Sequence, residues 1–478
     1  MMKRTILLVA AACLMLCASC SQYKYETVAG DPLGTKIYTL DNGLKVYMSV
    51  NKEAPRIQTY IAVKVGGKND PSETTGLAHY FEHLMFKGTQ KFGTSDYAAE
   101  KPLLDQIEAL FEVYRLTEDE AERARIYHQI DSISYIASDF FIPNEYDKLM
   151  SLIGAKGTNA YTSTDMTVYV EDIPSNQIEN WARIEADRFA NPVIRGFHTE
   201  LETVYEEKNM SLTNDFRKAL ENLDGMLFPD HPYGTQTVLG TQEHLKNPSI
   251  TNIKNYHKTY YVPNNIAICL SGDFDPDKMV EIIDKYFGQM QPNENLPELK
   301  LQTKSVIETP QSRDVYGIDA ETILMGWKYP GAGTDDALVA SVVSYILYNG
   351  SAGLIDLDLN QQQKVLGAQA MSYTRPDAGE FIIMANPKHG QSLEEVKDLV
   401  LAEIAKLRDG EFDESLLTGT INNLKLNMME VMEENSGRAD MYVQSFINGT
   451  DWADEVAWLD NLSKVTKQDV IDWASKYL

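Results

Sequence analysis

The chain is short of several residue types, and each shortage excludes a class of protein. It has four cysteines, of which only Cys20 and Cys269 would remain after removal of an export signal, so no internal disulfide framework is expected. Its 43 lysines and arginines are outnumbered by 70 aspartates and glutamates, for a net charge of −27. This balance argues against nucleic-acid binding, because phosphate recognition relies on basic side chains. Histidine is also scarce, with eight in 478 residues, and two of them stand close together.

The apolar stretch near the N-terminus, residues 5–16, is too short to cross a bilayer. Basic residues precede it and small residues follow it, which is typical of a signal peptide, here residues 1–19. The small residues directly before Cys20 resemble a bacterial lipobox, although Cys17 stands where leucine is usual. We expect cleavage before Cys20, lipidation of its thiol and a tether over residues 20–35, which anchors the protein to a bacterial membrane on its periplasmic or cell-surface face. Ordinary signal cleavage, giving a soluble exported protein, is the alternative.

The most informative segment is His79-Tyr80-Phe81-Glu82-His83. Residues four apart share one face of a helix, so His79 and His83 can offer two imidazoles to one metal ion. Catalytic zinc sites combine such ligands with an open position, and Glu82 stands where it can act as a base toward a water that the metal activates. The pattern H-x-x-E-H is that of the inverzincin peptidases. The alternative is a pair of surface histidines on an amphipathic helix.

Two histidines leave one protein ligand to be found, and a carboxylate is the usual third ligand in hydrolytic zinc sites. The best candidate region is the acidic segment 196–208. Glu200 and Glu207 are spaced to share one helical face, while Glu202 and Glu206 share another. Periodicity alone does not choose between these pairs, and acidic runs are often only solvated surfaces.

The chain resembles the pitrilysin/insulinase family of zinc metallopeptidases, which includes the mitochondrial processing peptidase. The resemblance runs from about residue 38 to the C-terminus and rests, besides the histidine motif, on Gly66-Gly67, Gly76-Leu77-Ala78, the segment from Gly157 to Ser163, Tyr261-Val262-Pro263-Asn264-Asn265 and Gly272-Asp273-Phe274. The family pattern Glu-x-x-x-Val/Ile-x-x-Glu falls on Glu200, Val204 and Glu207. It implies that Glu207 is the third ligand and Glu200 a supporting carboxylate of the catalytic centre, with Glu206 as the fallback ligand.

This resemblance implies one Zn²⁺ per chain and a metalloendopeptidase that hydrolyses peptides or unfolded polypeptide segments, with Glu82 as general base. The segment around Asn159 and Ala160 resembles the family's substrate-binding edge strand, to which an extended peptide would add through backbone hydrogen bonds. A non-catalytic structural or assembly subunit of the same family is the alternative. The intact metal motif argues against that alternative, and a plain membrane-surface binding lipoprotein would leave the motif unexplained.

The expected elements recur in the two halves of the chain, which predicts an α+β fold of two similar domains, each a largely antiparallel sheet packed with helices. Strands are expected at 36–40, 44–50 and 57–65, and later at 323–327 and 381–385. Helices are expected at 335–347 and 392–407, the second opened by a capping box at Ser392-Leu393-Glu394-Glu395. The polar, proline-bearing segment 292–309 is expected to link a catalytic zinc domain, residues 36–291, to a second homologous domain without a metal motif, residues 310–478.

The zinc domain is expected to contain an insertion. His83 and Glu207 stand farther apart in the chain than the corresponding residues of compact relatives, and the surplus lies at about residues 99–148. Pro102 is expected to start the first helix of an inserted hairpin, and Thr117-Glu118-Asp119-Glu120 to cap the second. We expect the hairpin to leave the zinc geometry unchanged.

In relatives that act as paired halves, the opposing half contributes an Arg and a Tyr that hold the substrate. The nearest counterpart here, residues 350–367, has neither residue at the matching positions. The chain also stops at Leu478, where relatives continue with one more strand. The resemblance therefore implies a zinc-bearing half, whose partner is a separate chain, a missing C-terminal half or a second copy in a homodimer.

Overall fold

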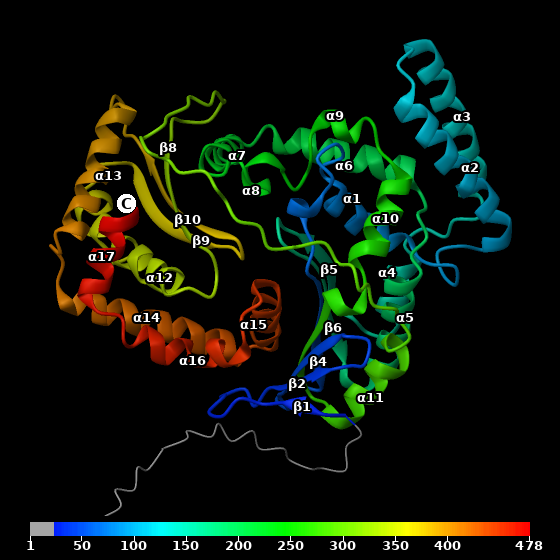
Figure 1. Ribbon diagram of the computed structural model, residues 1–478, viewed down its shortest axis with the longest axis horizontal. Helices are drawn as coiled ribbons and strands as arrows, with labels where there is room; N and C mark the ends of the chain where they lie inside the picture. The colour runs from blue at the N-terminus through cyan, green and yellow to red at the C-terminus, as the bar shows by residue number, and fades with distance from the viewer. Residues whose placement is uncertain (1–22) are drawn as a thin grey trace, which may run out of the picture.

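In the computed structural model, which describes residues 23–478, the first half of the chain folds around a seven-stranded sheet (Figure 1). The strands are β1 Tyr25–Glu26, β2 Lys36–Thr39, β3 Lys45–Val50, β4 Arg56–Val63, β5 Lys156–Thr162, β6 Thr167–Pro174 and β7 Ile266–Gly272. They lie in the order β1-β2-β3-β7-β4-β6-β5, and every neighbouring pair is antiparallel except β3 and β7. β7 is buried along its whole length in mid-sheet, whereas β5 forms one edge.

Helices supply the rest of the first domain. They are α1 Leu77–Leu84, α4 Glu145–Leu152, α5 Ile178–Ala190, α6 Phe197–Ser211, α7 Asp215–Leu227, α8 Pro232–Thr235, α9 Gln242–Leu245, α10 Ile250–Tyr260 and α11 Pro276–Phe287. The apolar faces of α1, α5, α10 and α11 pack with the sheet into one hydrophobic core. Burial of these faces is what holds the helices on the sheet, since isolated helices of this length are marginal in water.

The second half of the chain has its own sheet and its own core. Its strands β8 Ile323–Pro330, β9 Gly367–Thr374 and β10 Ala378–Asn386 lie in the order β8-β10-β9, all antiparallel. Its helices are α12 Asp335–Leu347, α13 Leu393–Arg408, α14 Glu414–Glu433, α15 Asn435–Asn448, α16 Trp452–Leu462 and α17 Lys467–Tyr477, of which α12, α13 and α17 pack on this sheet. The α+β fold of two domains is therefore confirmed, as is the capping box at Ser392 that opens α13.

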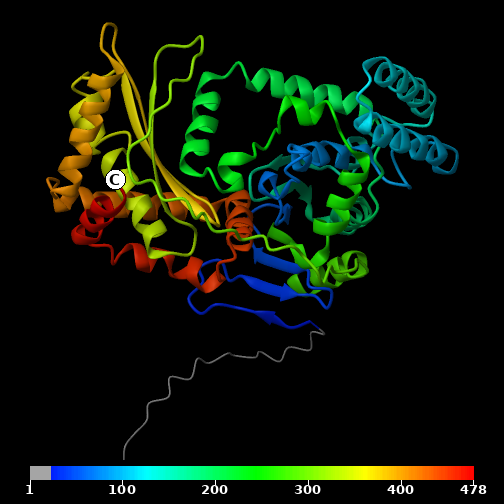
Figure 2. The same ribbon diagram turned by 45° about the horizontal axis from the view of Figure 1, so that its top comes forward.

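The two halves exchange helices (Figures 1 and 2). α15, from the second half, lies on the seven-stranded sheet, where the ring of Tyr442 stacks on Tyr47 beside the buried Cys269. α7, from the first half, packs on the three-stranded sheet, where Leu223 and Ile382 belong to one buried hydrophobic cluster. Because α7 follows directly on α6, the packing of α7 on the second domain also restrains the position of α6.

A buried ion cluster joins the second domain to the same region. Lys68, in the short helix η1 (Gly67–Asn69) before α1, places its Nζ 2.7 Å from Asp165 Oδ1 and 2.7 Å from Asp377 Oδ2. Asp165 follows β5, and Asp377 lies in the turn between β9 and β10. All three side chains are at most 5% exposed, and breaking such a pair would leave an uncompensated buried charge. Asp377 of the second domain is thus linked directly to Lys68, in the segment before α1, and through Lys68 to Asp165, just after the edge strand.

The expected insertion is a helical hairpin that projects from the first domain, but its helix starts differ from the expectation (Figure 1). The first helix, α2, spans Tyr97–Leu116, and the second, α3, spans Glu120–Ser138. Pro102 lies inside α2, whose N-cap is Asp96, and the N-cap of α3 is Asp119. Each aspartate accepts a hydrogen bond from a backbone N–H of the first turn and opposes the helix dipole, so it caps better than the residues chosen from the pattern.

Two expected boundaries also differ. The tether predicted for residues 20–35 is wrong in its second part, because β1 pairs with β2 and both Leu33 and Thr35 are buried. The connection between the domains continues past residue 309, since residues 288–322 contain neither helix nor strand. Among residues 23–478, no helix combines the length and the apolar character that crossing a bilayer requires.

Candidate metal centre

The helix that carries the histidine motif, α1, has a tightly built N-terminus. Gly76 precedes it with a φ of 87°, a left-handed conformation that favours glycine, and a Cβ there would meet Leu239 O at 2.8 Å. The buried carboxylate of Asp70 accepts hydrogen bonds from the N–H groups of Gly76, Leu77 and Ala78. Burial raises the pKa of Asp70 to about 8, against the effect of these hydrogen bonds. Three donors of the helix end are thereby satisfied without a capping side chain at Gly76.

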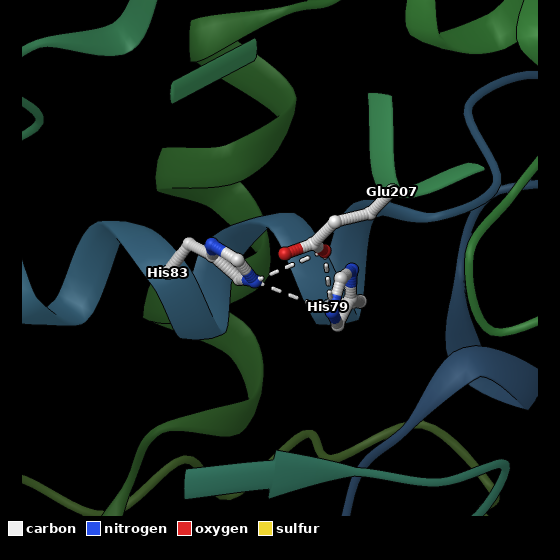
Figure 3. Close-up of side chains that lie close together, drawn as sticks. All are labelled: His79, His83 and Glu207. Carbon is white, nitrogen blue, oxygen red and sulfur yellow. Dashed lines mark hydrogen bonds and ion pairs between the residues drawn. The ribbon is translucent and has the colours of Figure 1, made fainter. Parts of the chain in front are cut away.

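Three atoms that could bind a metal ion converge beside α1. Figure 3 shows the imidazoles of His79 and His83 and the carboxylate of Glu207 turned toward one another. His79 Nε2 and His83 Nε2 lie 3.3 Å apart, and Glu207 Oε2 lies 3.6 Å from each. Ligand atoms held at about 2.0–2.1 Å by a tetrahedral zinc are roughly 3.3 Å from one another. Both the donor set and the spacing therefore fit a zinc ion, and within residues 23–478 this is the one such group of His, Cys, Asp and Glu side chains.

Helix α6 brings the carboxylates to α1. Glu207 joins the two histidines, and Glu200, two turns earlier on the same face, reaches the back of His83. Glu206 is exposed, and its carboxylate lies 3.5 Å from Asn209 Nδ2 and outside the converging group. Of the two pairs that periodicity left open, the packing of α6 thus brings Glu200 and Glu207 to the site.

Glu200 orients His83. The Nδ1–H of His83 donates to Glu200 Oε1 at 2.8 Å, which leaves Nε2 facing the site. The other oxygen of Glu200 pairs with Lys87 Nζ. Burial opposes the charge of Glu200, but the hydrogen bonds from His83 and Lys87 outweigh it and hold its pKa below the usual range. Burial likewise opposes protonation of His83, but the Glu200 bond and the nearby carboxylates raise its pKa. Sequence reasoning missed Lys87, although it follows His83 by four residues and could have been flagged by that spacing.

His79 is in the protonation state that binds metal. Burial, followed by the neighbouring His83 and Arg217, lowers the pKa of His79 to about 4, so the ring is neutral near pH 7. The side chains of His79 and His83 are 14% and 19% exposed, while that of Glu207 is 41% exposed. The site is therefore closed on the side of α1 and accessible to solvent on the side of α6.

Glu82 lies beside the group without being part of it. It is 8% exposed, and Thr162 Oγ1 donates a 2.5 Å hydrogen bond to its Oε2. Burial raises the pKa of Glu82, although the Thr162 bond opposes the shift. A carboxylate in this position can accept a proton from a water without occupying a ligand position. Sequence reasoning included Thr162 in the edge-strand segment but assigned it no role.

Asn159 and Ala160 lie on β5, at the edge of the sheet and next to α1. Their partners on the inner side are Val170 and Tyr169 of β6, so the outer side of the strand is the sheet edge. An edge of this kind can receive an extended peptide. Cys20, the expected lipidation site, lies outside the described residues.

The two-domain fold and the H-x-x-E-H helix together define an inverzincin-type metallopeptidase scaffold. The chain belongs to the pitrilysin/insulinase family. The model described as "Insulinase (Peptidase family M16)" matches residues 45–104, which include the motif, and the one described as "Peptidase M16 inactive domain" matches residues 249–424. The chain is 23% identical over 429 residues to "Zinc protease PqqE" of Helicobacter pylori, covering 86% of this chain and 84% of that protein.

Solved structures share the fold. A protease from Helicobacter pylori aligns with a TM-score of 0.75 at 19% identity, over 96% of this chain and 97% of that one. The first half of the periplasmic protease PqqL from Escherichia coli aligns with a TM-score of 0.65 at 15% identity, over 94% of this chain and 90% of that one. Against the longer PqqL structure the TM-score is 0.64 at 14% identity, and the match covers 94% of this chain but 47% of that one. At these identities the likeness concerns the fold alone.

Proposed function

We propose that the protein is a zinc metalloendopeptidase that hydrolyses peptides or unfolded polypeptide segments. The observation that carries the proposal is the convergence of His79, His83 and Glu207 beside a carboxylate, Glu82, that is not part of the ligand group. A zinc ion held by these residues would polarise the scissile carbonyl and lower the pKa of a water. Glu82 would accept the proton of the attacking water and return it to the leaving amine. Glu200 would keep the ring of His83 in its ligating orientation.

The substrate is proposed to bind as an added strand on β5. Backbone groups at Asn159 and Ala160 would pair with an extended peptide, which draws affinity from main-chain hydrogen bonds and makes few demands on sequence. Because β5 neighbours α1, a peptide in this register would pass beside the metal centre. A folded protein has its backbone groups already paired, so unfolded segments are the expected substrates.

A non-catalytic subunit is the competing function, and no specific observation favours it. The match to the inactive-domain model begins at residue 249, C-terminal to every residue of the metal centre. Metal analysis and peptide cleavage test the proposal. Protein comprising residues 20–478, supplied with a complementary half where activity requires one, is expected to hold about one zinc per chain. Chelation should abolish cleavage of an unfolded peptide, and added zinc should restore it. Protein that binds no zinc would contradict the proposal, as would zinc-loaded protein that cleaves no peptide either with or without the complementary half.

We further propose that the chain works as one half of a two-half peptidase. Residues 350–367 lack the Arg and Tyr that hold the substrate in paired relatives, and the match to PqqL covers about half of that protein. Positioning of the scissile bond is worth orders of magnitude in rate, so the isolated chain should cleave weakly. Adding a half that carries the Arg and Tyr should raise kcat/KM by more than about tenfold. A fully active monomer would refute this, and an active homodimer would place the clamp within residues 310–478.

We propose that the mature protein is a lipoprotein anchored through Cys20 on the periplasmic or cell-surface face of a membrane. The support is the N-terminal sequence, which has the basic, apolar and small-residue segments of a signal peptide before Cys20. Several acyl chains on one cysteine suffice for stable membrane attachment. Mass spectrometry of membrane fractions is expected to find a diacylated or triacylated N-terminal Cys20. Cys20→Ser should release the protein or leave it unprocessed. A soluble mature protein with an unmodified N-terminus would mean ordinary secretion.

A further inference from the structure

The end of the edge strand contacts the expected general base directly. Thr162, the last residue of β5, donates from Oγ1 to Glu82 Oε2 at 2.5 Å. Among residues 23–478, Thr162 is the one side chain that donates a hydrogen bond to Glu82. The position of Thr162 is itself well defined, because it pairs with Thr167 of β6, whose buried hydroxyl donates to Val65 O. The hydroxyl that meets Glu82 is therefore held by the sheet.

The alternation of side chains along β5 explains why this one residue reaches the site. Ala160 packs toward the core that contains α1, and Thr162, two residues on, faces the same way. Tyr161, between them, faces the opposite side, where it hydrogen-bonds to Asp440 of α15. A substrate paired along β5 would thus lie on the backbone that presents Thr162 to Glu82.

We propose that Thr162 is a positioning residue for Glu82, an inference that rests on the proposed peptidase function. A glutamate side chain has several rotamers, and the bond to Oε2 selects the one that leaves Oε1 to accept the proton of the attacking water. The same bond links the substrate strand to the base. A peptide paired along β5 would therefore lie on the same strand that orients Glu82, which fixes the base with respect to the bound substrate.

The test uses two substitutions that differ by one hydroxyl. Thr162→Val removes the donor and keeps the branched shape that suits a strand, whereas Thr162→Ser keeps the donor. In the full mature chain with its complementary half, Thr162→Val should retain zinc and thermal stability, leave KM within about twofold and lower kcat by about tenfold or more. Thr162→Ser should recover most of kcat. A purely structural role would instead lower the melting temperature and would not separate kcat from KM.

A double mutant shows whether Thr162 acts through Glu82. If it does, Glu82→Gln/Thr162→Val should turn over no more slowly than Glu82→Gln alone, because the base is already lost. Crystal structures should also show the Glu82 carboxylate rotated in Thr162→Val and unmoved in Thr162→Ser, a readout that needs no activity. An unchanged kcat in Thr162→Val, a further loss in the double mutant or an unmoved Glu82 would each overturn the inference. Absence of cleavage by the wild-type protein would contradict the proposed function instead, and the crystallographic comparison would still decide the role of Thr162.

Discussion

Glu82→Gln is expected to keep its zinc and to lose cleavage activity by at least about a hundredfold in kcat. The amide has nearly the shape of the carboxylate and can still accept a hydrogen bond from Thr162, but it cannot take a proton from water. Because the three proposed ligand atoms belong to His79, His83 and Glu207, removing the charge of Glu82 should leave the ligand set intact. Metal analysis and steady-state kinetics on the same preparation measure both effects.

A matched control for this variant is Glu202→Gln, which makes the same chemical change at a side chain that is 68% exposed on α6. It should alter neither zinc content nor kcat. Glu200→Gln should fall between the two, with a weaker loss of activity, because Glu200 acts by orienting His83. Loss of zinc from Glu82→Gln would mean that Glu82 is a ligand and would end its assignment as the base.

Glu207→Gln is expected to lower zinc affinity by more than the roughly 10–100-fold that loss of a supporting partner costs, and to abolish activity with it. The substitution removes the anionic oxygen that lies 3.6 Å from both imidazoles. Zinc is expected to bind the folded protein and not the unfolded chain, so it should raise the melting temperature of the wild type and change that of the variant little. Competition with a chelator of known affinity and thermal unfolding with and without zinc give the two readouts.

The adjacent residue supplies the control. Glu206→Gln changes the same type of side chain one position earlier on α6, where it is exposed and outside the converging group, and it should bind zinc like the wild type. If Glu206→Gln loses zinc and Glu207→Gln keeps it, α6 is turned by one residue from the orientation described above. The site would then have to be rebuilt on Glu206.

Helices could be predicted from the sequence where a single local pattern, such as apolar periodicity or a capping box, points to one start and one end. The helix at Asp335–Leu347 and the capping box at Ser392 occur as predicted, because apolar periodicity and a Ser–Glu pair act over a few residues. Helix starts in the insertion were misjudged because several polar residues compete there, and Asp96 and Asp119 form the caps. The tether was misjudged because β1 is two residues long and exists only through its pairing with β2.

By itself the sequence identified the two candidate histidine ligands, since four residues of one helix set the distance between His79 and His83 whatever surrounds them. The sequence limited the candidates for a third ligand to the glutamates on two faces of one acidic helix, and the family resemblance favoured Glu207. Only the tertiary structure decided which face meets the histidines, because α1 and α6 are distant in the chain and their contact depends on packing. The same holds for Lys87 behind Glu200 and for Thr162 beside Glu82, whose contacts join separate elements. Spacing in the chain specifies neighbours along one helix, whereas neighbours across elements are specified by the burial of apolar faces that brings those elements together.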